Sequence, residues 1–312
     1  MRADDSRSAV DAGCWLPAAS RRLPGGGRRL VPILPARILA LAILAVVAVG
    51  AQPTPTRVIS LVPALTEMVF AIGAGDRVVA VSSYDDDPPE VKSLPKVGAL
   101  IDPDVERIIT LRPDLVLLYG SQADLMTQLT RASIPYFGYR HSGLVGVTDT
   151  IRALGKRLGK VSEANAVVTS IDTRLATVRQ RTASLKKPRT LLVFGRESDS
   201  LRNIYASGGR GFLHDMLEVA GGVNVFADVK IESVEASTEM ILTRAPEVIL
   251  EIRSIEVPAG QTHDIGSWKV LASLPAVRAN RIYLLTGRSL VVPGPRVAEG
   301  VERMAAVLHA KP

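Results

Sequence analysis

Two glutamates, Glu106 and Glu239, occupy the same place in a motif that occurs twice in this 312-residue sequence. In each copy the glutamate opens the pattern E-x-I-x-T-x-x-P, and an acidic residue and a short apolar run follow. The copies span residues 106–117 (ERIITLRPDLVL) and 239–250 (EMILTRAPEVIL). Such a carboxylate can simply offset a helix dipole, or it can pair with a cation on another molecule. Matched placement in both copies favours a two-point contact with a partner that carries paired positive charges.

Each motif predicts a short helix followed by a strand. The helix is expected to begin at a capping residue, which is Asp102 before Pro103 in the first copy and Ser237 in the second. The motif proline, Pro113 or Pro246, then ends the helix because the residue before a proline avoids helical angles. Upstream of each copy lies a predicted helix that closes on glycines, so the order of elements is the same in both halves. Two related lobes explain this repetition.

The remaining sequence alternates short β-branched runs with helical segments, which is typical of parallel sheets covered by helices. Strands are predicted at 57–62, 77–81, 114–119, 134–139, 190–194, 247–252 and 281–285.

Residues 161–185 contain no glycine or proline and repeat apolar side chains at three- and four-residue steps, which predicts one long amphipathic helix. We therefore expect an N-terminal lobe at 57–160, a connecting helix at 161–187 and a C-terminal lobe at 188–312.

Charge and cysteine content weigh against several classes of function. The formal charge is +7, but residues 1–51 carry seven arginines against three aspartates, and the rest of the chain has 31 basic and 28 acidic residues. No basic block or stripe remains to bind nucleic acid. The single cysteine, Cys14, lies in the same leader, so the body of the chain can hold no disulfide, thiolate metal site or cysteine nucleophile.

Residues 1–51 are predicted to form a signal peptide and leader. A basic residue precedes the apolar run Ile38–Val49, which is shorter than the roughly 20 residues of a membrane span and suits a signal-peptide core. Val49 and Ala51 fit the positions before a cleavage site, so Gln52 is the expected new amino terminus. We expect a periplasmic or otherwise extracytoplasmic protein, and an uncleaved membrane anchor is the alternative.

Several segments resemble the iron-siderophore, haem and cobalamin solute-binding proteins of bacterial ABC importers. They are residues 57–98, which open with RVISLVPALTEMVFAIGAGDRVVAVSSYDDD, and residues 104–118, 204–228, 237–250 and 281–285. The likeness covers about residues 57–308.

The resemblance implies an α/β protein with two Rossmann-like lobes, whose parallel sheets are joined by one long connecting helix, and a ligand cleft between the lobes. It also implies permease docking by one glutamate on each lobe, and these positions fall on Glu106 and Glu239. The expected partners are a permease dimer with its ATPase subunits and a bulky metal-bearing chelate. We expect a monomer with no cofactor of its own.

Within this family the chain most resembles the cobalamin binders. Aromatic side chains match their ligand-contacting positions at Tyr84, Tyr119, Phe194 and Tyr205. Aromatic faces suit a large planar macrocycle because they supply apolar area at a low cost in entropy. Core packing at strand ends is the alternative for each. At two positions where the cobalamin binders have tryptophans, this chain has Leu100 and Ser233.

Three arginines keep a second ligand class open. Arg196, Arg288 and Arg296 have no obvious acidic partner in the sequence. As ligand contacts, they would suit an anionic siderophore or the propionates of haem, and a ferric siderophore or haem is thus the alternative to cobalamin. Ordinary surface charge is the other interpretation.

An enzyme and a metal-capture protein are the rivals from other classes. The predicted fold hosts many enzymes, but the turn after the first strand, LVPALT at 61–66, lacks the glycines of a dinucleotide or phosphate loop, and no nucleophile elbow occurs. The histidines show no metal-ligand spacing: they are His141, His214, His263 and His309. We therefore expect neither a catalytic site nor a metal site.

The leader generates the first testable prediction. Mature protein recovered from the cell envelope should begin near Gln52, because the cleavage site follows Ala51. Intact-mass measurement checks this, and retention of residues 1–51 would contradict it.

Overall fold

The computed structural model describes residues 53–254 and 265–310. The signal peptide predicted within residues 1–51 and the histidine at 263 lie outside the described residues. The chain from Pro53 onward forms one unit. Within the described ranges, no helix combines the length and apolar character that crossing a membrane requires.

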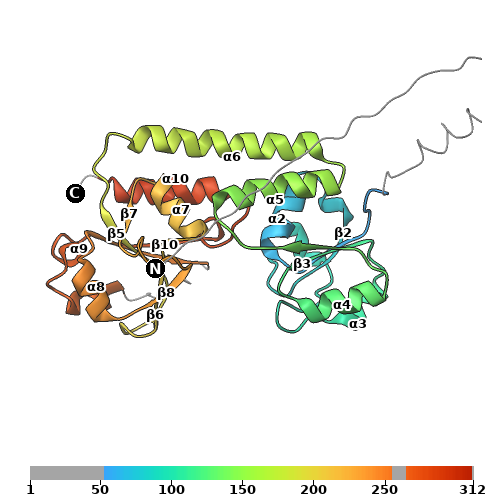
Figure 1. Ribbon diagram of the computed structural model, residues 1–312, viewed down its shortest axis with the longest axis horizontal. Helices are drawn as coiled ribbons and strands as arrows, with labels where there is room; N and C mark the ends of the chain where they lie inside the picture. The colour runs from blue at the N-terminus through green and yellow to red at the C-terminus, as the bar shows by residue number, and fades with distance from the viewer. Residues whose placement is uncertain (1–52, 255–264, 311–312) are drawn as a thin grey trace, which may run out of the picture. The chain divides into compact units, whose positions relative to one another are not determined.

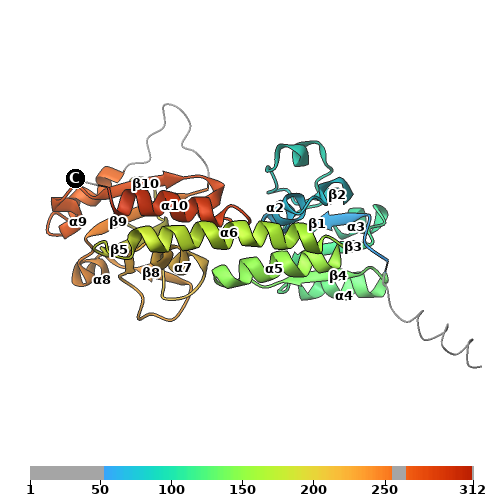
Figure 2. The ribbon, with the colours of Figure 1, turned by 90° about the horizontal axis from the view of Figure 1, so that it is seen from above.

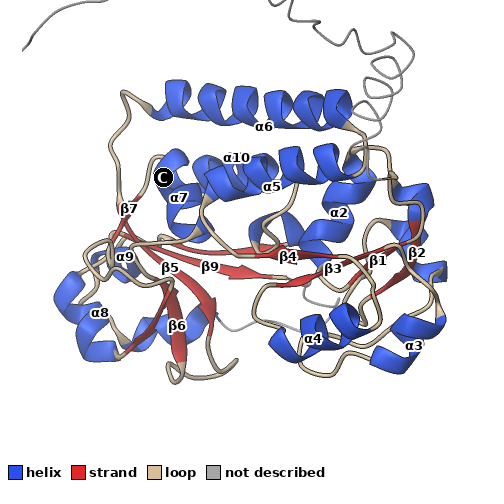
Figure 3. Cartoon of the chain, turned by 45° about the vertical axis from the view of Figure 1, so that its right-hand side comes forward, coloured by secondary structure: helices blue, strands red, loops and turns tan. Residues whose placement is uncertain are grey.

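Strands gather in two sheets (Figures 1 and 3). The first contains β1 (Val58–Ser60), β2 (Val78–Val81), β3 (Leu115–Tyr119) and β4 (Tyr136–Tyr139). The second contains β5 (Arg189–Gly195), β6 (Ile204–Ser207), β7 (Val223–Asn224), β8 (Ser233–Ala236), β9 (Val248–Arg253) and β10 (Ile282–Thr286).

The helices are α2 (Pro63–Ala71), α3 (Val105–Thr110), α4 (Ala123–Arg131), α5 (Leu144–Arg157), α6 (Val161–Thr182), α7 (Phe212–Val219), α8 (Thr238–Arg244), α9 (Pro275–Arg278) and α10 (Val297–Leu308). Short 3-10 helices are η1 (Gly75–Arg77), η2 (Pro89–Ser93), η3 (Ile265–Val270) and η4 (Arg288–Leu290).

The first sheet has the order β2-β1-β3-β4 with parallel pairing throughout, as predicted. The second sheet is mixed. Its β9 pairs in parallel with β5 and β10, but β6 lies antiparallel to both β5 and β8. The expectation of parallel sheets in both lobes is therefore corrected for the C-terminal lobe. The chain between β5 and β6 is too short for the helical crossover of a dozen or so residues that parallel neighbours need.

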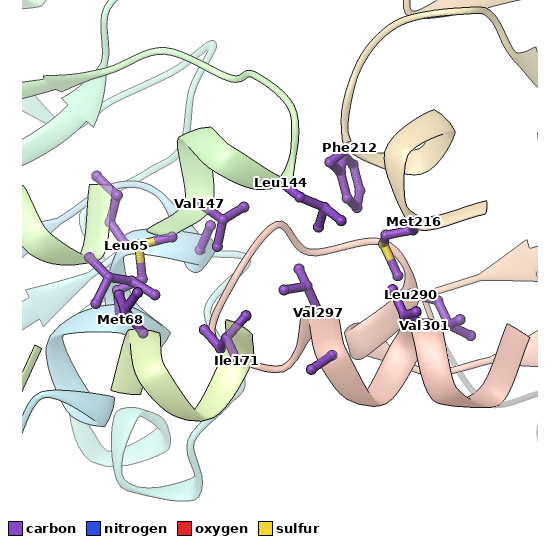
Figure 4. Packing of buried hydrophobic residues seen from close by; sticks show 14 of the residues in the cluster. Leu65, Met68, Leu144, Val147, Ile171, Phe212, Met216, Leu290, Val297 and Val301 are labelled. Atoms are coloured by element: carbon purple, nitrogen blue, oxygen red, sulfur yellow. The ribbon is translucent and has the colours of Figure 1, made fainter. Parts of the chain in front are cut away.

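Three clusters of buried apolar side chains pack against the two sheets in the described part of the chain. One cluster packs α2, α5, α6, α7 and α10 on a single side of both sheets, so it runs through both lobes without a break. Figure 4 shows this layer, with Leu65, Met68 and Val147 from one lobe meeting Phe212, Met216 and Val301 of the other through neighbouring side chains. The remaining two clusters each belong to one lobe and fill the opposite side of its sheet. We call the shared cluster the common core.

Helix α6 lies over the common core and spans both lobes (Figures 1 and 2). It begins at Val161 as predicted and ends at Thr182, slightly before the predicted end. Its buried side chains include Val168, Ile171 and Leu175, which confirms the predicted apolar stripe. Arg174 of α6 forms a bidentate ion pair with Glu302 of α10, with N–O distances of 2.9 and 2.7 Å.

The two motif helices begin in the same way. Ser237 caps α8 as predicted, because its hydroxyl accepts the Met240 N–H at 3.2 Å. The cap of α3 is Asp104 instead of the predicted Asp102, and its carboxylate accepts the Arg107 N–H at 3.0 Å. The cap lies later than predicted because the chain at residue 103 is still extended, paired in a β-bridge with residue 98.

The same helices also end alike. A residue in the left-handed region precedes the motif proline in both copies, with φ of 48° at Arg112 and 43° at Ala245. Such angles are uncommon for residues with a side chain. The shared backbone conformation supports the equivalence of the two copies, which the sequence pattern indicated.

A clip of hydrogen bonds joins each motif to the first strand of its lobe. In the N-terminal lobe, the Arg57 N–H donates to the Asp114 carboxylate at 2.8 Å, and the Arg57 guanidinium donates to the Leu111 carbonyl at 2.7 Å. Thr56 adds two further donors to the same carboxylate. The acid after the motif proline therefore fixes where the lobe's first strand begins.

The C-terminal clip repeats this arrangement. The Arg189 N–H donates to the Glu247 carboxylate at 3.0 Å, and the Arg189 guanidinium donates to the Arg244 carbonyl at 2.6 Å. Lys186 also pairs with Glu247. The motif acid thus has a structural role in each lobe.

The clips generate a stability prediction. Asp114→Asn and Glu247→Gln should each lower the free energy of unfolding by about 1–2 kcal/mol at neutral pH, because each removes charge-assisted hydrogen bonds. For Asp114, burial works to raise the pKa, but the hydrogen bonds from Thr56 and Arg57 outweigh it and leave the pKa lowered. For Glu247, Lys186 and then the Arg189 N–H lower the pKa.

A carboxylate whose pKa is depressed in the folded state contributes stability above its unfolded pKa of about 4 and loses it as the pH falls through the folded value. The variants should therefore approach the wild type in acid. Urea unfolding at about pH 7 and about pH 3 measures this. Asp172→Asn, on an exposed part of α6, is the matched control. Equal stability of clip variants and wild type at neutral pH would refute the role of the clips.

Candidate ligand cleft and docking surface

A cavity of about 500 Å³ lies where the two lobes face each other. His141 of the N-terminal lobe contributes to its wall, and the C-terminal lobe contributes the rest of the described lining. Those residues are Phe194, Arg210, Gly211, Phe212, Leu213, Glu232, Ser233, Arg253, Ser254 and Val291.

Strand ends position this wall. Phe194 is near the carboxyl end of β5, Arg253 ends β9, and His141 follows the end of β4. Open α/β sheets bind ligands beyond the carboxyl ends of their strands, and this cavity occupies that place. Helix α7 begins at the wall, after Gly211, whose φ of +88° turns the chain into the helix. The position of the cavity follows from the strand order.

A row of aromatic rings leads from the N-terminal lobe to the cavity. Tyr119 and Tyr139 have ring centroids 5.9 Å apart, Tyr139 and His141 6.3 Å, and His141 and Phe212 5.0 Å with perpendicular planes. Edge-to-face contacts in this range are favourable. The last contact crosses from one lobe to the other, so the row helps to hold the cavity walls in register.

Burial keeps Tyr139 and His141, in the middle of this row, uncharged. Burial lowers the pKa of His141, against a smaller opposing effect of Glu232, so the ring is uncharged at neutral pH. The Tyr139 hydroxyl lies 3.2 Å from His141 Nδ1, and burial raises the pKa of that hydroxyl. The cavity lining therefore combines neutral aromatic surface with the charged side chains of Arg210, Glu232 and Arg253.

Of the four aromatic residues predicted to contact the ligand, two lie at or next to the cavity and two lie outside its described lining. Phe194 lines the cavity, and Tyr119 lies in the aromatic row behind it. Tyr84, with 73% of its surface exposed, and Tyr205, with 41% exposed, are outside the described lining. Leu100 borders a separate hollow of the N-terminal lobe, whereas Ser233 is on the wall of the main cavity.

Arg196 was expected to face a ligand, and the structure corrects this. Its side chain is 0% exposed and pairs with the equally buried Glu251 at 2.7 Å. The same guanidinium donates to the carbonyls of Glu197, Ser198 and Ser200, at 2.7, 2.9 and 3.1 Å. Arg196 therefore shapes the connection between β5 and β6. Its partner is 55 residues away in sequence, which is why the local pattern did not show it.

Arg288 and Arg296 also have acidic partners, in the other lobe. Both pair with Glu67 of α2, at 3.2 and 3.0 Å, while Arg288 contacts Asp86 and Arg296 contacts Asp87 at 2.6 Å. Burial raises the pKa of Glu67, and the two arginines oppose that shift. We call this cluster the inter-lobe clasp. It corrects the expectation that these arginines lack partners, and it leaves Arg296 bordering a small hollow beside the clasp.

Glu106 and Glu239 are both exposed, and each is the second residue of its helix. The pKa of Glu239 is lowered, chiefly because its carboxylate accepts its own backbone N–H and then the Ser237 hydroxyl. Helices α3 and α8 lie on the side of their sheets away from α6 (Figures 1 and 3). The structure thus presents one carboxylate from each lobe on the same side of the protein.

Sequence reasoning missed several cavity residues, above all His141, Arg210, Phe212 and Arg253. His141 was regarded as an ordinary histidine without ligand spacing. A usable signal existed, because His141 lies two residues after one predicted parallel strand and Arg253 immediately follows another, and ligand contacts are expected at such strand ends. Arg210 and Phe212 follow the Ser-Gly-Gly turn at 207–209, whose place at the cavity only the tertiary fold reveals.

Comparisons with known proteins agree with this architecture. A family model for periplasmic binding protein matches residues 58–288. An uncharacterized ABC transporter substrate-binding lipoprotein of Bacillus subtilis is 30% identical over 260 residues, which cover 82% of this chain and 80% of that protein. The vitamin B12-binding protein of Yersinia pestis (strain Pestoides F) is 31% identical over 217 residues, which cover 69% of this chain and 74% of that protein.

Solved structures are similar as well. The periplasmic vitamin B12-binding protein of Vibrio cholerae has a TM-score of 0.68 and 27% identity, covering 81% of this chain and 96% of that one. A periplasmic heme-binding protein of Pseudomonas aeruginosa has a TM-score of 0.70 and 25% identity, covering 83% of this chain and 95% of that one. With a family model matched over most of its length and relatives at 30% identity, this chain belongs to the periplasmic binding protein family.

Proposed function

We propose that this protein captures a corrinoid, cobalamin, in the cavity between the lobes and delivers it to the permease dimer of an ABC importer, whose ATPase subunits drive uptake. The observation that carries the proposal is the aromatic wall, in which Phe212 of one lobe contacts His141 of the other and Phe194 adds a further ring to the lining. Neutral aromatic faces suit a broad macrocycle, and the cavity falls in the size range of small-molecule sites. Relatives named vitamin B12-binding proteins support the same ligand.

Haem or a ferric siderophore is the second candidate, and one feature of the cavity favours it. Arg210 lies on the wall, where its guanidinium group would pair with a carboxylate of an anionic ligand, and Arg253 on the same wall already pairs with Glu251 at 3.6 Å. Ser233 supplies no stacking surface at a wall position where the cobalamin binders that this chain resembles have tryptophan. A similar structure is named a heme-binding protein.

The proposal includes export and a purely binding role. Residues 1–51 direct the chain out of the cytoplasm, and the mature protein works as a monomer in the periplasm or an equivalent extracytoplasmic space. It carries no catalytic site, cofactor or metal of its own, and it has no nucleic-acid partner. Ligand chemistry in the cavity is limited to contact, charge pairing and exclusion of water.

Docking rests on Glu106 and Glu239. The common core joins the lobes, so the two carboxylates have a set separation before the protein meets its importer. Charges spaced in advance favour orientation and encounter rate more than raw affinity. Both glutamates lie outside the cavity lining, so they can serve docking without disturbing the ligand.

Ligand identity and place are tested together by calorimetric titration with cyanocobalamin, haemin and ferrichrome. Cyanocobalamin should bind, and Phe194→Ala should weaken it by roughly 1–3 kcal/mol because a cavity-lining ring is lost. Tyr136→Ala, a partly exposed aromatic of β4 outside the lining, is the control and should bind normally. Binding of haemin or ferrichrome alone would replace cobalamin with the second candidate. Unchanged affinity in Phe194→Ala would move the site out of this cavity.

Docking is tested by charge reversal at both positions, Glu106→Arg with Glu239→Arg. Uptake of the bound ligand should fall sharply, because like charges would then face the permease cations. Melting temperature and ligand affinity should stay close to wild type, since both side chains are exposed. Asp149→Arg with Asp172→Arg, on the helices of the opposite side, controls for net charge. Normal uptake by the Glu106/Glu239 variant would refute docking, and lost ligand binding would assign these glutamates to the pocket or the fold.

A further inference from the structure

We infer that Ile109 and Leu242 form the apolar half of the docking surface, and that the partner presents an apolar side chain beside each of its two docking cations. This inference rests on the proposed function, because it takes the importer's permease as the occupant of the surface. It adds a residue pair and a chemical requirement on the partner that the charges alone do not supply.

The two side chains occupy matching places on matching helices. Ile109 lies three residues after Glu106 in α3, and Leu242 lies three residues after Glu239 in α8. Their exposed fractions are nearly the same, 40% and 39%. Residues three apart lie on one helix face, so each apolar side chain neighbours the glutamate of its lobe.

Packing within the lobe does not account for this pair. The residue just before each, Ile108 or Ile241, is 0% exposed and seats its helix on the core of its own lobe. That residue already provides the apolar anchor that a short helix needs. A single exposed leucine or isoleucine is ordinary on a protein surface, but the same exposure at equivalent positions of two lobes indicates a shared use.

The surface also has a consistent direction and charge. Figures 1 and 3 place α3 and α8 on the side of the sheets away from α6, so both glutamate–apolar pairs belong to one side of the protein. The pKa of Glu239 is lowered, chiefly because its carboxylate accepts its own backbone N–H. Both glutamates are exposed, so a partner that docks on them presents one cation to each lobe.

Apolar side chains beside an ion pair change how much that pair contributes to binding. A fully hydrated surface ion pair contributes little, because water and salt screen it. An apolar contact that closes over one edge of the pair excludes water and strengthens the pair, as the rim does around interface hot spots. The apolar contact itself does not weaken with salt, which gives it a signature distinct from that of the charges.

The test uses spheroplasts of the source strain lacking this gene, to which purified protein loaded with radiolabelled cyanocobalamin is added; labelled haemin or ferrichrome takes its place if calorimetry selects one of those. The protein concentration that gives half-maximal uptake measures docking. Ile109→Ser with Leu242→Ser should raise it about ten-fold, at low and at high salt alike. Glu106→Gln with Glu239→Gln should also raise it, but the effect should shrink at high salt.

Val145→Ser with Val161→Ser is the matched control, since both valines are exposed apolar residues, 72% and 54%, on the helices of the opposite side. This variant should dock like wild type, and every variant should keep its melting temperature and ligand affinity. Wild-type docking by the Ile109/Leu242 variant, with weakened docking by the glutamate variant, would overturn the inference and leave the proposed function intact. Wild-type docking by both would overturn the docking surface itself.

Discussion

Burial of one shared apolar layer is the interaction on which the rest of this structure depends. One face of the first sheet packs against α2 and α5, and one face of the second packs against α7 and α10. Helix α6 closes this layer over both lobes. Because the layer is continuous, moving one lobe against the other on this side would expose apolar surface, at about 25 cal/mol per Å². The inter-lobe clasp around Glu67 adds charge pairs at its edge. The cavity and the motif helices α3 and α8 thereby keep fixed positions.

The clips fix the motif helices relative to the common core. Asp114 and Glu247 tie the end of each motif helix to the start of a strand that enters the common core. The motif helices α3 and α8 are short, and isolated helices of that length are unstable in water. Their buried isoleucines and their clips replace the stability that length would otherwise give. A repeated sequence motif therefore encodes a support and a presented surface together.

Much of the fold was predictable from the sequence, because its signals are local and periodic. The family, the two lobes, the long helix and the cap at Ser237 are confirmed. The antiparallel β6 and β8 were not predicted, since the short connection after β5 carries no periodic signal. The partners of Arg196, Arg288 and Arg296 were missed because Glu251 and Glu67 are distant in sequence. The cavity wall depends on how two lobes meet, which a single sequence does not encode locally.

The buried pair of Arg196 and Glu251 has a consequence for how sequences of this kind can change. Trp268 also donates its indole N–H to Glu251, and Arg253 pairs with the same carboxylate at 3.6 Å, so this buried carboxylate joins three side chains. Removing Glu251 alone takes the shared carboxylate from Arg196 and Arg253, and breaking a buried ion pair in this way typically costs about 3–5 kcal/mol, whereas a well-packed apolar pair can be tolerated. Replacement of Glu251 alone is therefore costly, while joint replacement with Arg196 remains open. In evolutionary terms, the two positions form a coupled unit whose alternatives are reached by paired replacement and not by gradual drift at one site.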